Sequence, residues 1–186
     1  IMNELAKQGF TQSYTYFTWR SSKNELIEYV EELTKSDQKE FYRPNFWPNT
    51  PDINPGHLQH GNESIHLQRY FLAATLSSSI GIYGPVFEYQ ISTPLAPGKE
   101  EYLNSEKYEF FKWDWDKQNK ITTVISRINK IRNEHASLQQ TNNIDFCATN
   151  NDKVMAYYKF DDEKQDETLM VASLDSNYTA QSMVLL

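Results

Sequence analysis

The sequence predicts an α/β fold in which parallel strands are joined by helices, followed by a module of antiparallel strands. Before about residue 140, short β-prone runs alternate with segments whose apolar residues recur every three or four positions. Such alternation is typical of parallel strands connected by right-handed crossovers. Beyond that point, strand-like runs follow one another with only polar turns between them, which is typical of antiparallel pairing.

The first elements are a helix end, a strand and a helix. Residues 1–9 have the pattern of the last turns of a helix closed by Gly9, so the chain is expected to be cut from a longer protein. Residues 10–17 are rich in aromatic residues and threonine, and they predict a strand. The next helix is expected after Ser22, because Glu25 completes a capping box. Its apolar positions have helical spacing and are Leu26, Tyr29, Val30 and Leu33.

Two more strands and two more helices follow. Residues 41–47 predict a second strand, which is short because Pro44 cannot donate to a ladder. Residues 62–79 predict a helix, and residues 80–89 a third strand that ends at a Gly-Pro pair. The long loop 90–119 precedes a fourth helix with one apolar stripe. That stripe consists of Ile121, Val124, Ile125, Ile128 and Ile131.

The last part of the chain predicts an antiparallel β module. Its strand-like runs are residues 146–150, 154–160, 168–174 and 182–186. The change of pattern places a domain boundary between Leu138 and Asn143. Residues 1–140 and 141–186 are therefore expected to form separate domains.

The composition excludes several classes of function. The net charge of −7 argues against nucleic acid or an anionic membrane as a partner. No apolar run approaches the roughly 18 residues needed to span a bilayer. Cys147 is the only cysteine, so no disulfide framework or zinc cluster is expected, and a cytoplasmic location fits. The four histidines show no metal-ligand spacing, and neither a metal nor a cofactor is expected.

Two polar loops that follow predicted strands hold the candidate site residues, because function in a βα barrel sits at the carboxyl ends of strands. Asp52 lies in "NTPDIN", and it can be read either as a turn residue or as a carboxylate held for catalysis. Lys107 and Tyr108 lie in "SEKYE", where they either cap a turn or contact a ligand. The "WDWD" run at 113–116 is expected to anchor this loop.

Five blocks, in order, carry a resemblance to a known family. They are "GFTQSYTYFTWR", "RPNFWPNTPDINP", "LAATLSSSIGIYGPVFE", "PGKEEYLNSEKYEFFKWDWD" and "RINKIRNEHASLQ". Together they resemble the α-1,4-glucan:maltose-1-phosphate maltosyltransferases, a branch of the α-amylase superfamily (glycoside hydrolase family thirteen). The most specific block is "NTPDI", because most amylase relatives have a histidine where Pro51 stands here.

The resemblance implies a fold and a fragment. The family has a (β/α)₈ TIM barrel followed by an antiparallel β-sandwich domain. By comparison with the family fold, this chain would contain the C-terminal part of the barrel, about strands six to eight, and part of the sandwich. Three strands cannot close such a barrel. Strand edges and apolar helix faces would then be exposed, so we expect self-association or a homodimer.

The resemblance also implies a chemistry. Family enzymes are retaining glycosyltransferases that pass maltosyl units from maltose 1-phosphate to the non-reducing end of an α-glucan. Asp52 matches the third family carboxylate, which stabilises the transition state, and Lys107 and Tyr108 match positions that hold the second glucose. The nucleophilic Asp and the acid–base Glu would lie before Ile1, so the chain alone is expected to be inactive.

The sequence departs from the family pattern at three places, and three alternative functions stay open. Trp47 and Pro48 stand where family members have smaller apolar residues, the loop at 56–63 is rearranged, and Asn104 replaces an Asp. The first two leave the donor and acceptor preference open. Within the superfamily, an α-glucan hydrolase or a trehalose-forming isomerase is the alternative. Outside enzymes, the alternative is a non-catalytic glucan-binding homologue.

Overall fold

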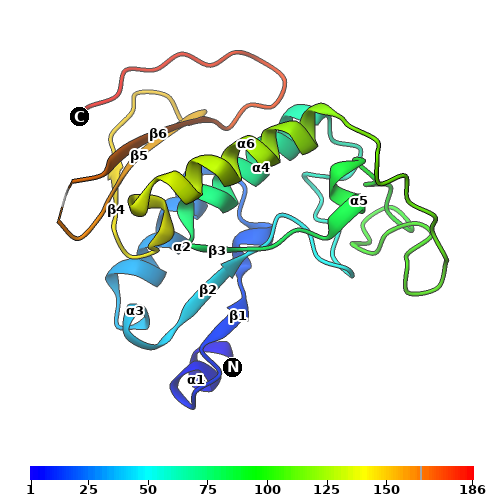
Figure 1. Ribbon diagram of the computed structural model, residues 1–186, viewed down its shortest axis with the longest axis horizontal. Coiled ribbons are helices and arrows are strands. Elements are labelled where there is room, and N and C mark those ends of the chain that lie inside the picture. Colours follow the sequence, from blue (N-terminus) through cyan, green and yellow to red (C-terminus); the bar gives the residue numbers. More distant parts are fainter. Residues whose placement is uncertain (164) are drawn as a thin grey trace.

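The computed structural model describes residues 1–163 and 165–186, and it contains two three-stranded sheets with helices between them (Figure 1). One sheet is parallel with the order β1-β2-β3, and the other is antiparallel with the order β4-β5-β6. The mixed α/β class that the sequence predicts is therefore confirmed. In chain order, the elements are α1 (Met2–Lys7), β1 (Gln12–Tyr14), η1 (Tyr16–Trp19), α2 (Lys23–Lys35), α3 (Gln38–Phe41), β2 (Arg43–Phe46), α4 (Glu63–Leu76), β3 (Ser79–Ile80), α5 (Gly84–Glu88), α6 (Lys120–Glu134), η2 (Ala136–Gln139), β4 (Ile144–Cys147), β5 (Val154–Phe160) and β6 (Glu167–Ser173).

The parallel sheet is built as the alternation of strands and helices predicts. In its register, Tyr14 of β1 lies beside Asn45 of β2, and Asn45 lies beside Ser79 of β3. Helix α2 connects β1 to β2, and α4 connects β2 to β3 (Figure 1). All three strands therefore end at the same edge of the sheet, where the loops that carry the candidate site begin.

Residues 10–17 and 80–89 form less strand than the sequence predicts. The second of these predictions is wrong for most of its length, because only Ile80 of that run belongs to β3. Pro85 stands in the first turn of α5, where a missing N–H group costs no hydrogen bond. After β1, the chain turns at once into the 3₁₀ helix η1, whose carbonyl groups bind a side chain of α4 described below.

The predicted helices begin at hydrogen-bonded caps. Ser22 and Glu25 form the expected capping box at the start of α2, and the Glu25 carboxylate accepts the Ser22 N–H at 3.0 Å. The Asn62 side chain accepts the Ile65 N–H at 3.1 Å at the start of α4, and Asn119 caps α6 in the same way. Helix α3 has four residues, which is too short to give a periodic apolar signal.

The antiparallel module is confirmed, and three of its four predicted runs overlap strands, although β4 shares only Phe146 and Cys147 with the run predicted at 146–150. Strand β5 pairs with β4 and along its full length with β6. The prediction of a strand at 182–186 is wrong, because only Val184 forms an isolated bridge, to Thr149. The side chains of Met183 and Leu185 stay exposed, so no burial stabilises an extended strand there.

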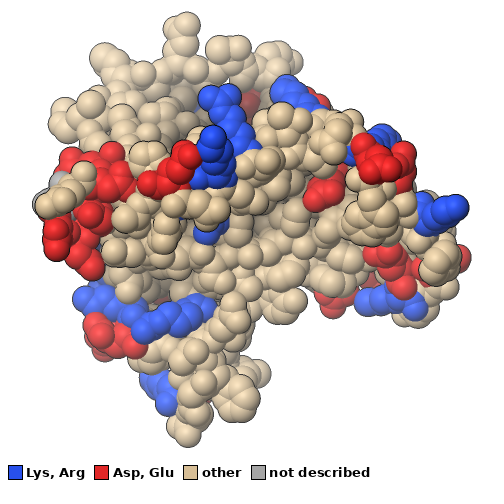
Figure 2. Space-filling view, viewed as in Figure 1, with Lys and Arg blue, Asp and Glu red and all other residues tan. Residues whose placement is uncertain are grey.

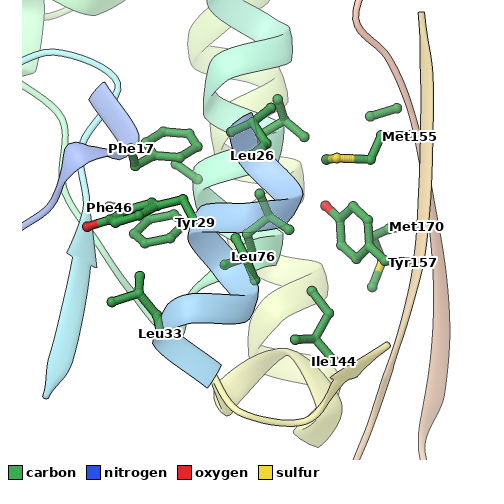
Figure 3. Close-up of a cluster of buried hydrophobic side chains, with 14 of the residues drawn as sticks. Phe17, Leu26, Tyr29, Leu33, Phe46, Leu76, Ile144, Met155, Tyr157 and Met170 are labelled. Atoms are coloured by element: carbon green, nitrogen blue, oxygen red, sulfur yellow. The ribbon is translucent and has the colours of Figure 1, made fainter. Parts of the chain in front are cut away.

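One buried apolar cluster lies between the two sheets, with α2 and α4 in its centre (Figure 3). On the side of the parallel sheet, the rings of Phe17 and Phe46 stack with centroids 4.6 Å apart. On the other side, Met155 and Tyr157 of β5 point toward the helices (Figure 3). This cluster holds the parallel sheet and the antiparallel module in contact, while the boundary between Leu138 and Asn143 stays a prediction.

The surface shows no single sign of charge on the face in Figure 2. Basic and acidic side chains form small separate groups there, and an acidic group lies near the β5–β6 end of the molecule. None of the helices in the described residues is long and apolar enough to cross a membrane.

Candidate functional site

Asp52 lies in a tight turn that follows β2. The backbone N–H and C=O groups of Thr50 pair with those of Ile53, at 3.1 and 3.3 Å, so that Pro51 and Asp52 occupy the two corner positions. Pro51 suits the first corner because its ring fixes φ. The Thr50 hydroxyl donates to Asp52 Oδ1 at 2.9 Å, and the Asp52 side chain is otherwise exposed. The turn therefore presents one carboxylate to solvent in a restricted orientation.

The side chains of Asn49 and Tyr102, which are both buried, hold this turn by hydrogen bonds. Asn49 Nδ2 donates to the Tyr102 hydroxyl at 3.0 Å, and that hydroxyl donates to the Ile53 carbonyl at 3.1 Å. Asn49 Oδ1 accepts the N–H of Tyr83 at 2.9 Å, which connects the turn to the segment after β3. Burial raises the pKa of Tyr102, so its hydroxyl keeps the proton that it donates.

The other end of the turn is fixed to the long loop 90–119. Asn54 is fully buried, its backbone N–H donates to the Glu100 carbonyl at 2.6 Å, and its Nδ2 donates to the Ser92 carbonyl at 2.8 Å. Gln59 Nε2 donates to the Lys99 carbonyl at 2.9 Å. The loops that follow β2 and β3 therefore form one hydrogen-bonded unit.

Lys107 and Tyr108 lie in a turn of the same long loop. The Ser105 carbonyl accepts the N–H of Tyr108 at 2.9 Å, and Lys107 Nζ lies 3.8 Å from Glu101 Oε1. The Tyr108 ring is 80% exposed. In the described part of the chain, no hydrogen bond or ion pair joins either residue to Asp52. The three candidate residues therefore lie on two different loops, the turn after β2 and the long loop 90–119, and the hydrogen bonds of the described residues do not link them directly.

The "WDWD" run packs within the long loop and also contacts Tyr89, the residue just before this loop. Trp113 Nε1 donates to Glu106 Oε1 at 2.9 Å, and the Trp113 ring stacks on Phe111 at 5.3 Å between centroids. The Tyr83 hydroxyl donates to the other Glu106 oxygen. Trp115 is largely exposed, so the anchoring expected of this run comes from Trp113, whose ring lies 5.7 Å from that of Tyr89, and from the Asp114 carbonyl, which accepts the Tyr89 hydroxyl.

Trp47 fills the carboxyl edge of the parallel sheet. Its ring meets Tyr14 edge-on, with centroids 5.0 Å apart, and it also lies over Gly81. A Cβ atom at residue 81 would be 2.2 Å from Trp47 Cε2, so only glycine fits beneath the indole. The large indole of Trp47 is therefore matched by a glycine 34 residues later.

Burial keeps His57 and His66, two histidines near the site, from taking up a proton easily. Burial, followed by repulsion from Arg69 and His66, lowers the pKa of His57 to about 3. Burial also lowers the pKa of His66, whose Nδ1 lies 3.0 Å from the Asn62 carbonyl. Among the described residues, no group of three or more His, Cys, Asp or Glu side chains could hold a metal ion.

Sequence reasoning missed the residues that position Asp52. Asn49 and Tyr102 lie 53 positions apart, so their hydrogen bond follows from tertiary structure alone. Asn49 had a local signal, since it directly precedes the turn and is an amide able to bind two backbone or side-chain groups. Tyr102 and Glu100 had none.

Comparison with known proteins agrees with the resemblance seen in the sequence. No family model matches the chain. The maltosyltransferase of Methylacidiphilum infernorum is 51% identical over 177 residues, which cover 95% of this chain and 26% of that protein. Those of Chlorobaculum tepidum and Salinibacter ruber are 47% and 43% identical over 185 residues, and the chain covers 28% of each.

A solved structure shares the fold. The chain aligns with a noncanonic maltogenic α-amylase, AmyB from Thermotoga neapolitana, with a TM-score of 0.61 and 17% sequence identity. The alignment covers 94% of this chain and 40% of that one. The chain spans 26 to 28% of the length of the three curated relatives named above. Over that segment, the resemblance to the α-1,4-glucan:maltose-1-phosphate maltosyltransferases is confirmed.

Proposed function

We propose that the chain is part of a longer retaining glycosyltransferase that moves maltosyl units from maltose 1-phosphate to the non-reducing end of α-1,4-glucans. The observation that carries this proposal is the identity of 43 to 51% with maltosyltransferases over at least 95% of the chain. The match includes most or all of the chain, so it extends over the loops that carry the candidate site. The hydrolase, the isomerase and the glucan-binding homologue lack comparable support.

Asp52 is proposed to stabilise the reacting sugar. An exposed carboxylate on a braced turn can accept hydrogen bonds from ring hydroxyls, and its charge favours the oxocarbenium-like transition state. The Thr50 hydroxyl holds one carboxylate oxygen and leaves the other free to accept such a bond. A nucleophilic Asp forms the maltosyl-enzyme with loss of phosphate, and an acid–base Glu assists transfer to the acceptor 4-hydroxyl; both belong to the rest of the longer protein.

Lys107 and Tyr108 are proposed to bind the second glucose of the maltosyl unit. The Lys107 ammonium supplies a charged donor, and the Tyr108 ring supplies a flat surface on which a sugar can stack. Both are accessible on the long loop, with the Lys107 side chain 40% exposed and Tyr108 80% exposed.

We further propose that β1, β2 and β3 are about strands six to eight of a TIM barrel, and that residues 1–140 and 141–186 belong to the barrel and to a β-sandwich domain. The likeness to an α-amylase structure supports this assignment. Exposed aromatic side chains on and after β1, including Tyr14 and Tyr16, would be covered in the complete barrel or in a homodimer. The partly buried thiol of Cys147 fits a cytoplasmic protein.

The test uses the full-length protein with maltose 1-phosphate and a short α-glucan. Transfer predicts release of phosphate together with acceptors lengthened by two glucose units. Free maltose as the main product would indicate a hydrolase, trehalose formation from maltose an isomerase, and binding without turnover a glucan-binding homologue. The 186-residue chain alone is expected to release no phosphate, and detectable turnover by it would contradict the assignment of the two missing carboxylates.

A further inference from the structure

Arg69 of α4 is the largest fully buried side chain in the described residues, with 1% exposure. Its guanidinium donates to the carbonyls of Phe17 and Arg20, at 2.6 and 2.7 Å, and lies 4.0 Å from the centre of the Phe17 ring. Among the described residues, no carboxylate pairs with it. Burying a guanidinium without a carboxylate partner costs free energy of folding. The two carbonyls that it binds therefore indicate what its position contributes to the structure.

These two carbonyls belong to η1 and to the residue that follows it. The Phe17 carbonyl already accepts the Arg20 N–H at 3.1 Å within η1, so Arg69 adds a second hydrogen bond to it, while the Arg20 carbonyl marks the point where the chain leaves η1. The planar fork of an arginine can donate to two carbonyls at once, which a lysine cannot do with the same geometry. Arg69 therefore fixes η1 to α4, the helix at the centre of the core.

Helix η1 in turn holds both ends of the segment that carries Asp52. On the near side, the Thr18 hydroxyl donates to the Trp47 carbonyl at 2.7 Å. On the far side, Trp19 Nε1 donates to Glu100 Oε1 at 2.7 Å, and the Glu100 carbonyl accepts the Asn54 N–H at 2.6 Å. One short helix thus binds the backbone before the turn and the loop residue that fixes the backbone after it.

We propose that Arg69, Thr18 and Trp19 are positioning residues that act together to aim the Asp52 carboxylate. The inference rests on the proposed role of Asp52. It goes further, because it assigns a catalytic consequence to three residues outside the loops that contact substrate. In enzymes, a displacement of ~1 Å at a reacting group can cost about 100-fold in rate, so loss of one connection should be measurable.

The test compares Thr18→Val and Trp19→Phe in the full-length protein. Thr18→Val removes one donor and keeps the size of the side chain, and Trp19→Phe removes the indole N–H at a position that is 42% exposed. Each is expected to lower kcat by about tenfold or more, with a smaller change in KM, because the turn would be misaimed and not lost. Thr34→Val is the matched control, since the buried Thr34 hydroxyl donates to Val30 within α2 at 2.8 Å. It should leave kcat unchanged.

The same variants are then made in an Asp52→Asn background. If η1 acts through Asp52, Thr18→Val and Trp19→Phe should cause no further loss there. An equal loss in both backgrounds, or unchanged kcat in the single variants, would overturn the inference. Full activity of Asp52→Asn alone would overturn the proposed function, which separates the two failures.

Arg69 is tested through its conservative variant and through the position of the turn. Arg69→Lys should fall between the parent and Arg69→Met in kcat, because a lysine can bind one of the two carbonyls but not both in the same geometry. If Arg69→Met does not fold, crystal structures of Thr18→Val decide the matter. An Asp52 turn that is unmoved in that variant would contradict the inference.

Discussion

Replacement of Lys159 by Met should stabilise this chain at neutral pH. Lys159 lies in β5 with 0% exposure, and its ammonium donates to the Gln140 carbonyl in the segment before β4. In the described residues it has no carboxylate partner, while Arg132 of α6 lies near enough to repel it. Burial, followed by this repulsion, lowers the pKa of Lys159 from its ordinary 10.5 to about 7.

The sign and size of the effect follow from proton linkage. Between pH 7 and 10.5 the unfolded chain holds this proton and the folded chain does not, so the free energy of unfolding rises with pH. At about 1.4 kcal/mol for each pKa unit, burying the charged form costs on the order of 5 kcal/mol below pH 7. About 2 kcal/mol of that cost should disappear between pH 7 and pH 9.

Urea unfolding at pH 7, 8 and 9 measures this directly. The parent chain should gain about 2 kcal/mol over that range, and Lys159→Met should lose this part of the pH dependence. At pH 7 the variant should be the more stable protein. The Gln140 carbonyl then has no donor, which reduces the gain in the free energy of unfolding by about 1–3 kcal/mol. The exposed Lys153 supplies the control Lys153→Met, which should keep the parent slope. If the free energy of unfolding of Lys159→Met rises with pH as steeply as that of the parent, Lys159 is not the group that causes the pH dependence.

Three further outcomes follow from the contacts around the site and the antiparallel module. Tyr102→Phe leaves buried Asn49 Nδ2 without its acceptor, so urea unfolding should show a loss of about 1–3 kcal/mol; an unchanged midpoint would contradict the brace. Gly81→Ala forces the Trp47 ring to move, so it should cost about 1–3 kcal/mol and shift the tryptophan fluorescence. Hydrogen bonds from His135 and Ser137 lower the pKa of Asp166, so the stability that they provide is present above the ordinary Asp pKa of 3.8 and lost as pH falls below it. As pH falls below 3.8, Asp166→Asn should therefore lose less free energy of unfolding than the parent. An equal loss in both proteins would contradict a stabilising contact between Asp166 and His135.

The local parts of this fold are readable in the sequence. Helical spacing and the Ser22–Glu25 capping box place α2, and the alternation of strands and helices gives the parallel order of the first sheet. Both signals depend on residues close together in the chain. The position of Asp52 at the carboxyl end of β2 follows from the same reasoning.

The parts that sequence reasoning could not reach depend on distant contacts. The η1 turn is held by Arg69, which donates hydrogen bonds to residues 49 and 52 positions earlier in the chain. A periodic sequence pattern cannot predict a hydrogen bond between residues so far apart. The run at 182–186 is apolar and strand-like in composition, but its side chains stay largely exposed, so composition alone predicts the wrong structure there. Whether Asp52 meets Lys107 and Tyr108 across a sugar is likewise a property of the longer protein with substrate bound.

The central claim is that Asp52 stabilises the transition state of maltosyl transfer. The most direct measurement is kcat for phosphate release from maltose 1-phosphate by the full-length protein carrying Asp52→Asn, with Asp37→Asn, at an exposed aspartate that makes no side-chain cap contact, as the control. We expect kcat to fall by about 1,000-fold or more in Asp52→Asn, with an unchanged unfolding midpoint, and to stay at the parent value in Asp37→Asn. Turnover by Asp52→Asn close to that of the parent would show that Asp52 is only a turn residue.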